Sequence, residues 1–276
     1  MTRLVKILKT LGLFDLCFSI ARRLGLLPIA YATYESAIAR QAPDDESQSE
    51  AGGLPVPPAR LRALVAGADR QKFLAFGSSM FQLIVDTLRN NGVPVHTLGA
   101  VLDFGCGCGR VLRYWHGVRG PRIYGTDYNP RLVEWGQRNL PFARVSANTR
   151  SPPLPYESET FDCVYAVSVF THLSEALQTA WMVELLRVTR PGGVLILTTH
   201  GERRLEPLTE RQRMEFAAGR MVVVNGEASG MNLCNAYHPE VFVRSRLATG
   251  CAVAEFVPGG TREAITQDLY LMRKSG

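Results

Sequence analysis

The chain of 276 residues is long enough to form one large domain, and 46% hydrophobic with 20% charged residues is a globular composition. The net charge is +6, but the basic residues are scattered apart from Arg22-Arg23 and Arg203-Arg204, which argues against nucleic-acid binding. The six cysteines have neither metal-ligand nor disulfide-framework spacing, so we expect a reducing cytoplasm and no metal site.

The first 40 residues are apolar and basic, and they predict an amphipathic helix. Asp15 interrupts the apolar stretch, which is also shorter than the ~20 residues of a membrane-spanning helix. The stretch ends in Arg22-Arg23 without the small-residue cleavage site of a signal peptide. Two interpretations remain open: a helix that covers the core, and a helix that lies on a membrane surface.

Residues 41–58 change in composition to acidic residues, Ser, Gly and Pro, which predicts a flexible linker. The domain organisation that follows is an N-terminal region over residues 1–58 and a folded domain over 59–276. Two helices are expected at the start of this domain, over 59–66 and 79–90, the second with Met80, Ile84 and Leu88 on one face.

Residues 101–110 are an apolar run that breaks into glycines at alternate positions, which predicts a strand, a tight turn and a helix from about Gly109. Glycine serves where the backbone needs positive φ or a ligand must approach closely. The N–H groups at the start of a helix would face that ligand, so we expect a nucleotide-like molecule here. The G-x-G-x-x-G dinucleotide pattern fails, because Arg110 or Leu112 stands at its third glycine, which argues against a nicotinamide oxidoreductase.

The rest of the chain alternates strands and helices, which predicts a parallel sheet with helices on both faces. Asn129 and Pro130 form a natural helix start. Residues 201–237 are expected to be an insertion that covers the substrate, with a candidate strand at 221–224. The expected strands are 122–126, 142–146, 161–167, 194–199, 252–257 and 268–272, and the expected helices begin at 130, 174 and 238.

An acidic residue, Asp103, stands two positions before the G-x-G-x-G loop, and this segment resembles the first motif of the class I S-adenosylmethionine (SAM)-dependent methyltransferases. Pro191-Gly192-Gly193 before a hydrophobic strand is similar to a further motif of that family. The resemblance implies a Rossmann-like α/β fold, doubly wound around a mostly parallel seven-stranded sheet, here with an N-terminal helical extension. It also implies SAM as the cofactor.

Asp127 follows Gly109 by 18 positions, at the end of a strand, where a carboxylate can accept both hydrogens of a ribose diol. A helix cap is the alternative role for this aspartate. The resemblance further implies that Asp103 organises the loop near the SAM ammonium, that Asn148 contacts the adenine amine, and that the segment from Ser168 lines the sulfonium. The expected cofactor-binding residues are therefore Asp103, Gly105, Gly107, Gly109, Asp127, Asn148 and Ser168.

Three histidines, His200, His238 and His172, are expected at the carboxyl edge of the sheet. Histidine has a suitable pKa to take the proton of a hydroxyl acceptor, and position in the chain ranks His200 first and His172 last. Amino-methylating DNA and protein enzymes of this family hold a planar nitrogen with an Asn/Asp-Pro-Pro-Tyr segment, and no such segment follows the fourth strand here. Together with the lack of a basic tract for nucleic acid, this absence favours O-methylation of a small molecule, a sugar or a lipid-linked glycan. N-methylation and SAM binding without catalysis remain open, as does peripheral membrane contact through residues 1–40.

Overall fold

The computed structural model describes residues 50–275 apart from 231 and 263, together with isolated positions between 20 and 40. The amphipathic helix predicted over residues 1–40 thus lies, apart from those positions, outside the described residues. The chain divides into two compact units, Met1–Phe73 and Leu74–Gly276. No helix within the described part of the chain is long and apolar enough to cross a membrane.

Residues 50–58 were expected to belong to a flexible linker, but part of this range has regular structure. Strands β1 (Glu50–Ala51) and β2 (Leu54–Pro55) form a short antiparallel hairpin, and the Leu54 side chain is buried. The Arg62 guanidinium donates hydrogen bonds to the backbone oxygens of Pro57 and Ala68. In a flexible linker these carbonyls would instead be hydrogen-bonded to water. Arg62 lies on helix α4 (Ala59–Val65), which confirms the helix predicted at 59–66.

The larger unit is built on one seven-stranded sheet with the order β10-β11-β7-β6-β3-β4-β5. The five strands from β7 to β5 in this order are parallel, and β11 pairs antiparallel with both β7 and β10. This confirms the mostly parallel, Rossmann-like sheet. The strands are β3 (Ala100–Phe104), β4 (Arg122–Asp127), β5 (Ala143–Ala147), β6 (Phe161–Ala166), β7 (Thr189–Thr199), β10 (Cys251–Val257) and β11 (Asp268–Lys274).

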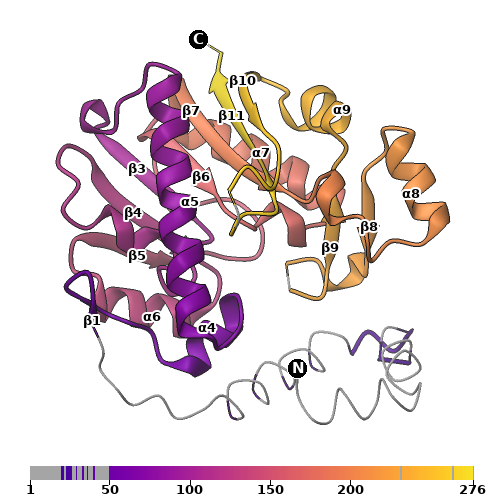
Figure 1. The fold of residues 1–276 in the computed structure, drawn as a ribbon, viewed down its shortest axis with the longest axis horizontal. Coiled ribbons are helices and arrows are strands. Elements are labelled where there is room, and N and C mark those ends of the chain that lie inside the picture. The colour runs from indigo at the N-terminus through magenta and orange to yellow at the C-terminus, as the bar shows by residue number, and fades with distance from the viewer. Residues whose placement is uncertain are drawn as a thin grey trace. The chain divides into compact units, whose positions relative to one another are not determined.

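The order of strands reverses direction at β3, because β4 and β5 extend the sheet on one side and β6 and β7 on the other. Right-handed crossovers then place helix α6 (Pro130–Asn139) and helix α7 (Glu175–Val188) on opposite faces. Helix α5 (Arg70–Asn90) crosses the front of the sheet in Figure 1, and α7 lies behind it. The point of reversal is where ligands bind in such sheets.

The core fills the space between the sheet and α7. Trp181, Leu185 and Val188 of α7 are buried, and the Trp181 ring packs on Phe104 of β3 with centroids 4.6 Å apart. The same core includes side chains of helix α9 (Glu240–Phe242) and of the π-helix η6 (Val243–Leu247), which together form the helix expected from 238. On α5, Met80, Ile84 and Leu88 are fully buried, which confirms the predicted face.

Two local predictions are wrong. The glycine loop leads into turns and a short 3-10 helix, η2 (Leu112–Trp115), instead of an α-helix from Gly109. Strand β7 begins at Thr189, before Pro191, because Phe161 pairs with Thr189 and Cys163 with Val194. The Pro-Gly-Gly segment is therefore a bulge inside the strand, where the positive φ of Gly192 lets the chain loop out.

The insertion at 201–237 has more structure than the expected strand at 221–224. It contains the 3-10 helices η4 (Glu202–Arg204) and η5 (Gly226–Ala228), helix α8 (Glu210–Ala217), and a hairpin of β8 (Val222–Val224) with β9 (Asn235–Tyr237). Helix α8 begins with a capping box of Thr209 and Gln212, a signal present in the sequence. Two more 3-10 helices, η1 (Val95–Thr97) and η3 (Phe170–His172), connect elements of the sheet.

Candidate functional site

The glycine loop, residues 105–109, folds back over the carboxyl end of β4. The backbone N–H groups of Gly105 and Cys106 donate to the Thr126 carbonyl at 2.8 and 2.9 Å. The φ angles of Gly105, Gly107 and Gly109 are 78°, 56° and 80°, in the left-handed region that side chains other than glycine rarely adopt. The sequence prediction of a turn that needs glycine at these positions is confirmed.

Neighbouring elements hold this loop closely. A Cβ atom on Gly105 would lie 2.3 Å from Val169 Cγ2, and one on Gly109 would lie 2.5 Å from Leu140 Cδ1. Behind the loop, a Cβ on Gly77 of α5 would lie 2.0 Å from the carbonyl oxygen of Arg110. Sequence reasoning did not single out Gly77, because the helix was predicted to start after it, at residue 79.

Asp127, the last residue of β4, ties the loop to the start of α6. Its Oδ2 accepts from the Gly107 N–H at 2.9 Å, and its Oδ1 accepts from the Asn129 N–H at 2.8 Å. The cap of α6 is Asn129 itself, whose side chain accepts from Arg131 N as predicted. A carboxylate oxygen can accept more than one hydrogen bond, so the geometry permits Asp127 to bind a diol as well.

Asp103 is buried at the end of β3, beside the loop. Burial raises the pKa of its carboxyl to about 7, and the nearby Asp127 charge acts in the same direction. A hydrogen bond from Tyr165 and the charge of Arg110 oppose this shift. Tyr165 in turn accepts from Trp115 Nε1 at 2.9 Å, so two buried aromatic side chains fix the carboxylate. Asp103, Asp127 and Arg110 thus place titratable groups of both signs beside the loop.

Asn148 and Ser168 follow β5 and β6 at the same edge. The Asn148 backbone N–H donates to the Asp127 carbonyl at 3.1 Å, while its side-chain Oδ1 is buried without a partner among the described residues. Ser168 has a φ of 60°, a strained value for a residue with a side chain. The bond from its N–H to Thr198 Oγ1, at 2.8 Å, holds this conformation.

Gln267, directly before β11, links this segment to the neighbouring strand. Its Oε1 accepts from Ser168 Oγ at 2.9 Å and from Thr198 Oγ1 at 2.8 Å. The amide nitrogen therefore faces His200, and Nε2 of Gln267 lies 3.3 Å from Nε2 of that histidine. Sequence reasoning missed Gln267. Its one signal was its place before a strand that pairs antiparallel with β7 and so starts at the carboxyl edge.

The three histidines lie together at this edge, as expected. The rings of His172 and His200 have centroids 6.4 Å apart, and the His238 backbone N–H donates to the His200 carbonyl. Burial lowers the pKa of His200 to about 3, with the charge of Arg204 and the other two histidines adding to the effect. Burial likewise lowers the pKa of His238 to about 3 and that of His172 below its usual value. All three rings are neutral near pH 7.

Hydrogen bonds fix which nitrogen of each neutral ring carries the proton. His172 Nδ1 donates to the Cys234 carbonyl at 2.7 Å, which leaves Nε2 with the lone pair. His238 Nε2 donates to Gln178 Oε1 at 3.0 Å, because the Gln178 amide nitrogen already donates to two carbonyls. In His200 the hydrogen-bonded nitrogen is the acceptor: Nε2 accepts from the Gln267 amide. The proton is therefore on Nδ1, which has no partner in the described chain.

Comparison with known proteins identifies the family. A family model described as a methyltransferase domain matches residues 102–197. Human methyltransferase-like protein 27 is 30% identical to this chain over 171 residues, which cover 55% of this chain and 68% of that protein. The chain belongs to the class I SAM-dependent methyltransferases. This methyltransferase is also 36% identical over 104 residues to the malonyl-[acyl-carrier protein] O-methyltransferase of Salmonella typhimurium, and it spans 38% of that enzyme's length.

Solved structures show the same fold. The magnesium protoporphyrin IX methyltransferase of Synechocystis PCC 6803, with bound S-adenosylhomocysteine (SAH), matches with a TM-score of 0.53 and 18% identity, covering 74% of this chain and 87% of that one. A SAM-dependent methyltransferase from Methanosarcina mazei matches with a TM-score of 0.52 and 18% identity, covering 68% of this chain and 97% of that one. At this level of identity the likeness concerns the fold alone.

The residues at the carboxyl ends of β3, β4 and β5 of this methyltransferase, the proposed cofactor edge, fit SAM. The buried, unpartnered Oδ1 of Asn148 is an acceptor for which the adenine amine would be a donor. The SAM ammonium would bring positive charge near Asp103, whose pKa burial and the Asp127 charge raise despite Arg110. Bound SAM brings a methyl group already activated on sulfur, so the chain's own residues must chiefly align an acceptor and exclude water.

Proposed function

We propose that this methyltransferase transfers the methyl group of SAM to a hydroxyl oxygen of a small molecule or sugar, lipid-linked glycans included. The observation that carries the proposal is the cluster of three neutral histidines at the carboxyl edge of β6 and β7, under the 201–237 insertion. A hydroxyl acceptor must lose its proton as the new bond forms, and a neutral imidazole can take it. The similarity to O-methyltransferases of acyl-carrier-protein and tocopherol substrates also supports an oxygen acceptor.

The proton positions favour His172 as the base, followed by His238. His172 Nε2 carries the lone pair, and the residue is only partly buried. Val169, three residues earlier in the chain, lies against Gly105 of the glycine loop. Its Nδ1–H is held by a carbonyl, which fixes the ring for proton abstraction at Nε2. His200 instead presents an N–H, and its role is then to donate a hydrogen bond. Hydrogen bonding thus supports a different order from the one based on position in the chain.

The first experiment establishes the cofactor and the acceptor class. Calorimetry should show binding of SAM and SAH and none of NAD, since the loop lacks the third glycine of a dinucleotide site. The full chain with SAM is then screened against hydroxyl acceptors, glycans and lipid-linked glycans among them, with SAH release as the signal. Transfer to an amine nitrogen, with no product from any hydroxyl acceptor, would contradict the proposal.

The base is tested with His172→Ala, His238→Ala and His200→Ala, and with His116→Ala as an exposed control outside the site. Loss of the base should lower kcat by ~10²–10⁴ and leave SAM affinity nearly unchanged. We expect this result for His172→Ala. If all three variants keep wild-type turnover, alignment alone accounts for catalysis and the histidine assignment is withdrawn.

We also propose that the enzyme acts in the cytoplasm and contacts membranes peripherally through residues 1–40. The apolar side chains and flanking Arg and Lys of this segment support the proposal, since such helices bind anionic surfaces. Sedimentation with anionic liposomes should deplete the full chain more than a chain that begins at Ala59. Equal partitioning of the two would instead favour a helix that covers the core.

A further inference from the structure

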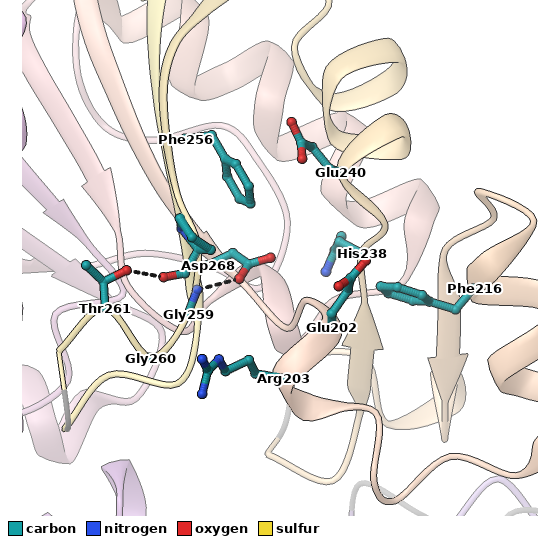
Figure 2. Close-up of a pocket in the computed structure, with 11 residues that line it drawn as sticks. Glu202, Arg203, Phe216, His238, Glu240, Phe256, Gly259, Gly260, Thr261 and Asp268 are labelled. Carbon is teal, nitrogen blue, oxygen red and sulfur yellow. Dashed lines mark hydrogen bonds between the residues drawn. The ribbon is translucent and has the colours of Figure 1, made fainter.

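A pocket of about 350 Å³ opens at the carboxyl edge beyond the histidine cluster. Its wall includes η4 of the insertion, the start of α9, the loop after β10 and the first residue of β11. Figure 2 shows that carboxylates and aromatic rings surround it. Its lining includes Glu202, Glu240, Asp268, His238, Phe216 and Phe256. Its size suits part of a small molecule.

Two side chains at the inner end of the pocket are buried. Asp268 is 6% exposed; its Oδ1 accepts from the Gly259 N–H at 2.7 Å, and no second donor among the described residues contacts the carboxylate. His238 is fully buried, and its Nδ1, which bears the lone pair, has no partner in the described chain. Figure 2 shows His238 on the wall between Asp268 and Phe216. The His238 Nδ1 acceptor is buried without a donor, which is costly, so it marks a place where a ligand donor belongs.

The rim adds more negative charge than positive charge. Glu202 and Glu240 are exposed there, and Glu240 pairs with Arg244 of its own helical region at 2.7 Å. Burial raises the pKa of Asp268, and the charges of Glu202 and Glu240 add to this effect, while the hydrogen bond from Gly259 opposes it. Arg203 is the one cationic side chain in the lining, and its guanidinium packs on the backbone of Gly260. The pocket therefore offers several acceptors and an excess of carboxylates.

We propose that this pocket, the acidic pocket, binds a protonated amine of the acceptor molecule and thereby selects hydroxyl acceptors that also carry an ammonium group. An ammonium has three N–H donors and a positive charge, which match Asp268, Glu202 and the His238 lone pair. Phe216 and Phe256 provide apolar area for the carbon frame beside it. The inference rests on the proposed O-methylation, because it names the substrate class of that same site.

The test uses three probes of equal frame on the full chain saturated with SAH: trans-4-aminocyclohexanol, trans-1,4-cyclohexanediol and trans-4-hydroxycyclohexanecarboxylate. Each keeps one hydroxyl, and the second group is cationic, neutral or anionic. Titrations followed by NMR should give at least ~10-fold tighter binding of the amine than of the diol, and weakest binding of the carboxylate. Asp268→Asn, which keeps an acceptor for Gly259, and Glu202→Gln should each reduce the preference.

Glu210→Gln is the matched control, since it removes the same charge from an exposed position of the insertion outside the pocket. If Asp268→Asn does not fold, Glu202→Gln at the rim still decides the result. Equal binding of amine and diol, tighter binding of the carboxylate, or a preference that survives both variants would overturn the proposal. So would tighter binding of Mg²⁺ or Ca²⁺ than of the amine. Failure of the wild type to bind SAH would count against the proposed methyl transfer instead.

Discussion

The proposed cofactor edge, at the carboxyl ends of β3, β4 and β5, and the proposed acceptor edge, at the carboxyl ends of β6 and β7 and the start of β11, are built in different ways. The first uses glycines and backbone N–H groups that follow one another within a few residues, with Asp127 as their link. The second uses side chains brought together from distant segments, such as Gln267 with Ser168 and His238 with Gln178. A local backbone motif can be recognised in a sequence, whereas a side-chain network depends on the completed fold.

The largest effect on cofactor affinity is expected when a loop glycine of the cofactor edge is replaced by a residue with a side chain. Gly107→Val should lower SAH affinity by more than ~100-fold, because Gly107 has a φ of 56° and a β-branched residue is strained there beside the ligand. Calorimetry on the folded variant measures the effect. Gly117→Val is the control, since Gly117 also has positive φ but lies outside the glycine loop, with nothing near its Cβ position. Wild-type affinity in a folded Gly107→Val protein would remove the loop from the cofactor site.

The next largest effect separates ligand binding from helix capping. Asp127→Ala should weaken SAM binding by roughly 1.5–3 kcal/mol, the scale for losing hydrogen bonds to a charged acceptor. Asn129→Ala, which removes the cap of α6, should cost about 1 kcal/mol of stability and leave affinity unchanged. Isothermal titration and chemical denaturation distinguish the two. Unchanged affinity in Asp127→Ala would reduce this residue to a structural role.

A pH titration sharpens the role of Asp103. Its pKa is raised to about 7 by burial first, so below that pH the free protein holds a proton on this carboxyl. Only the ionised form attracts the ligand ammonium, and the proton must leave on binding. SAH affinity should thus fall by up to about tenfold per unit as the pH drops from about 7 to 5.5, and level off above it. Asp103→Asn should abolish the slope; a slope that persists in that variant would assign the titration to another group.

The smallest effect on cofactor affinity is expected from a substitution at the acceptor edge. Gln267→Ala should leave SAH affinity within about twofold while lowering the free energy of unfolding by about 1–3 kcal/mol, because Ser168, Thr198 and His200 lose a shared partner. Thr266→Ala, next in the chain and exposed, is the control. A large loss of SAH affinity in Gln267→Ala would mean that the two edges are coupled.

Prediction from the sequence succeeded where structure is locally determined. The Asn129-Pro130 start of α6 and the buried face of α5 are confirmed, because capping and helical periodicity act within a turn or two of the chain. The hairpin at Glu50 was missed, since burial of Leu54 outweighs the polar, proline-rich composition around it. The start of β7 was also missed, because a bulge lets the strand continue through Pro191.

The acceptor edge was only partly predictable for the same reason. His172, His200 and His238 were expected near one another because they follow elements that end at one edge of the sheet. Which ring nitrogen bears the proton depends on Gln267, Gln178 and the Cys234 carbonyl, none of which is a sequence neighbour of its histidine. The acidic pocket likewise combines residues from η4 to β11. Contacts between segments that are so far apart in the chain cannot be predicted from residue spacing.

The close approach of α5 to the glycine loop has a consequence for turnover. Because Gly77 brings the helix backbone against the Arg110 carbonyl, the loop cannot retreat in that direction to let a nucleoside out. Any movement of the loop during exchange of SAH for SAM is therefore expected on the side away from α5, and a larger residue at position 77 should alter the rate of SAH release.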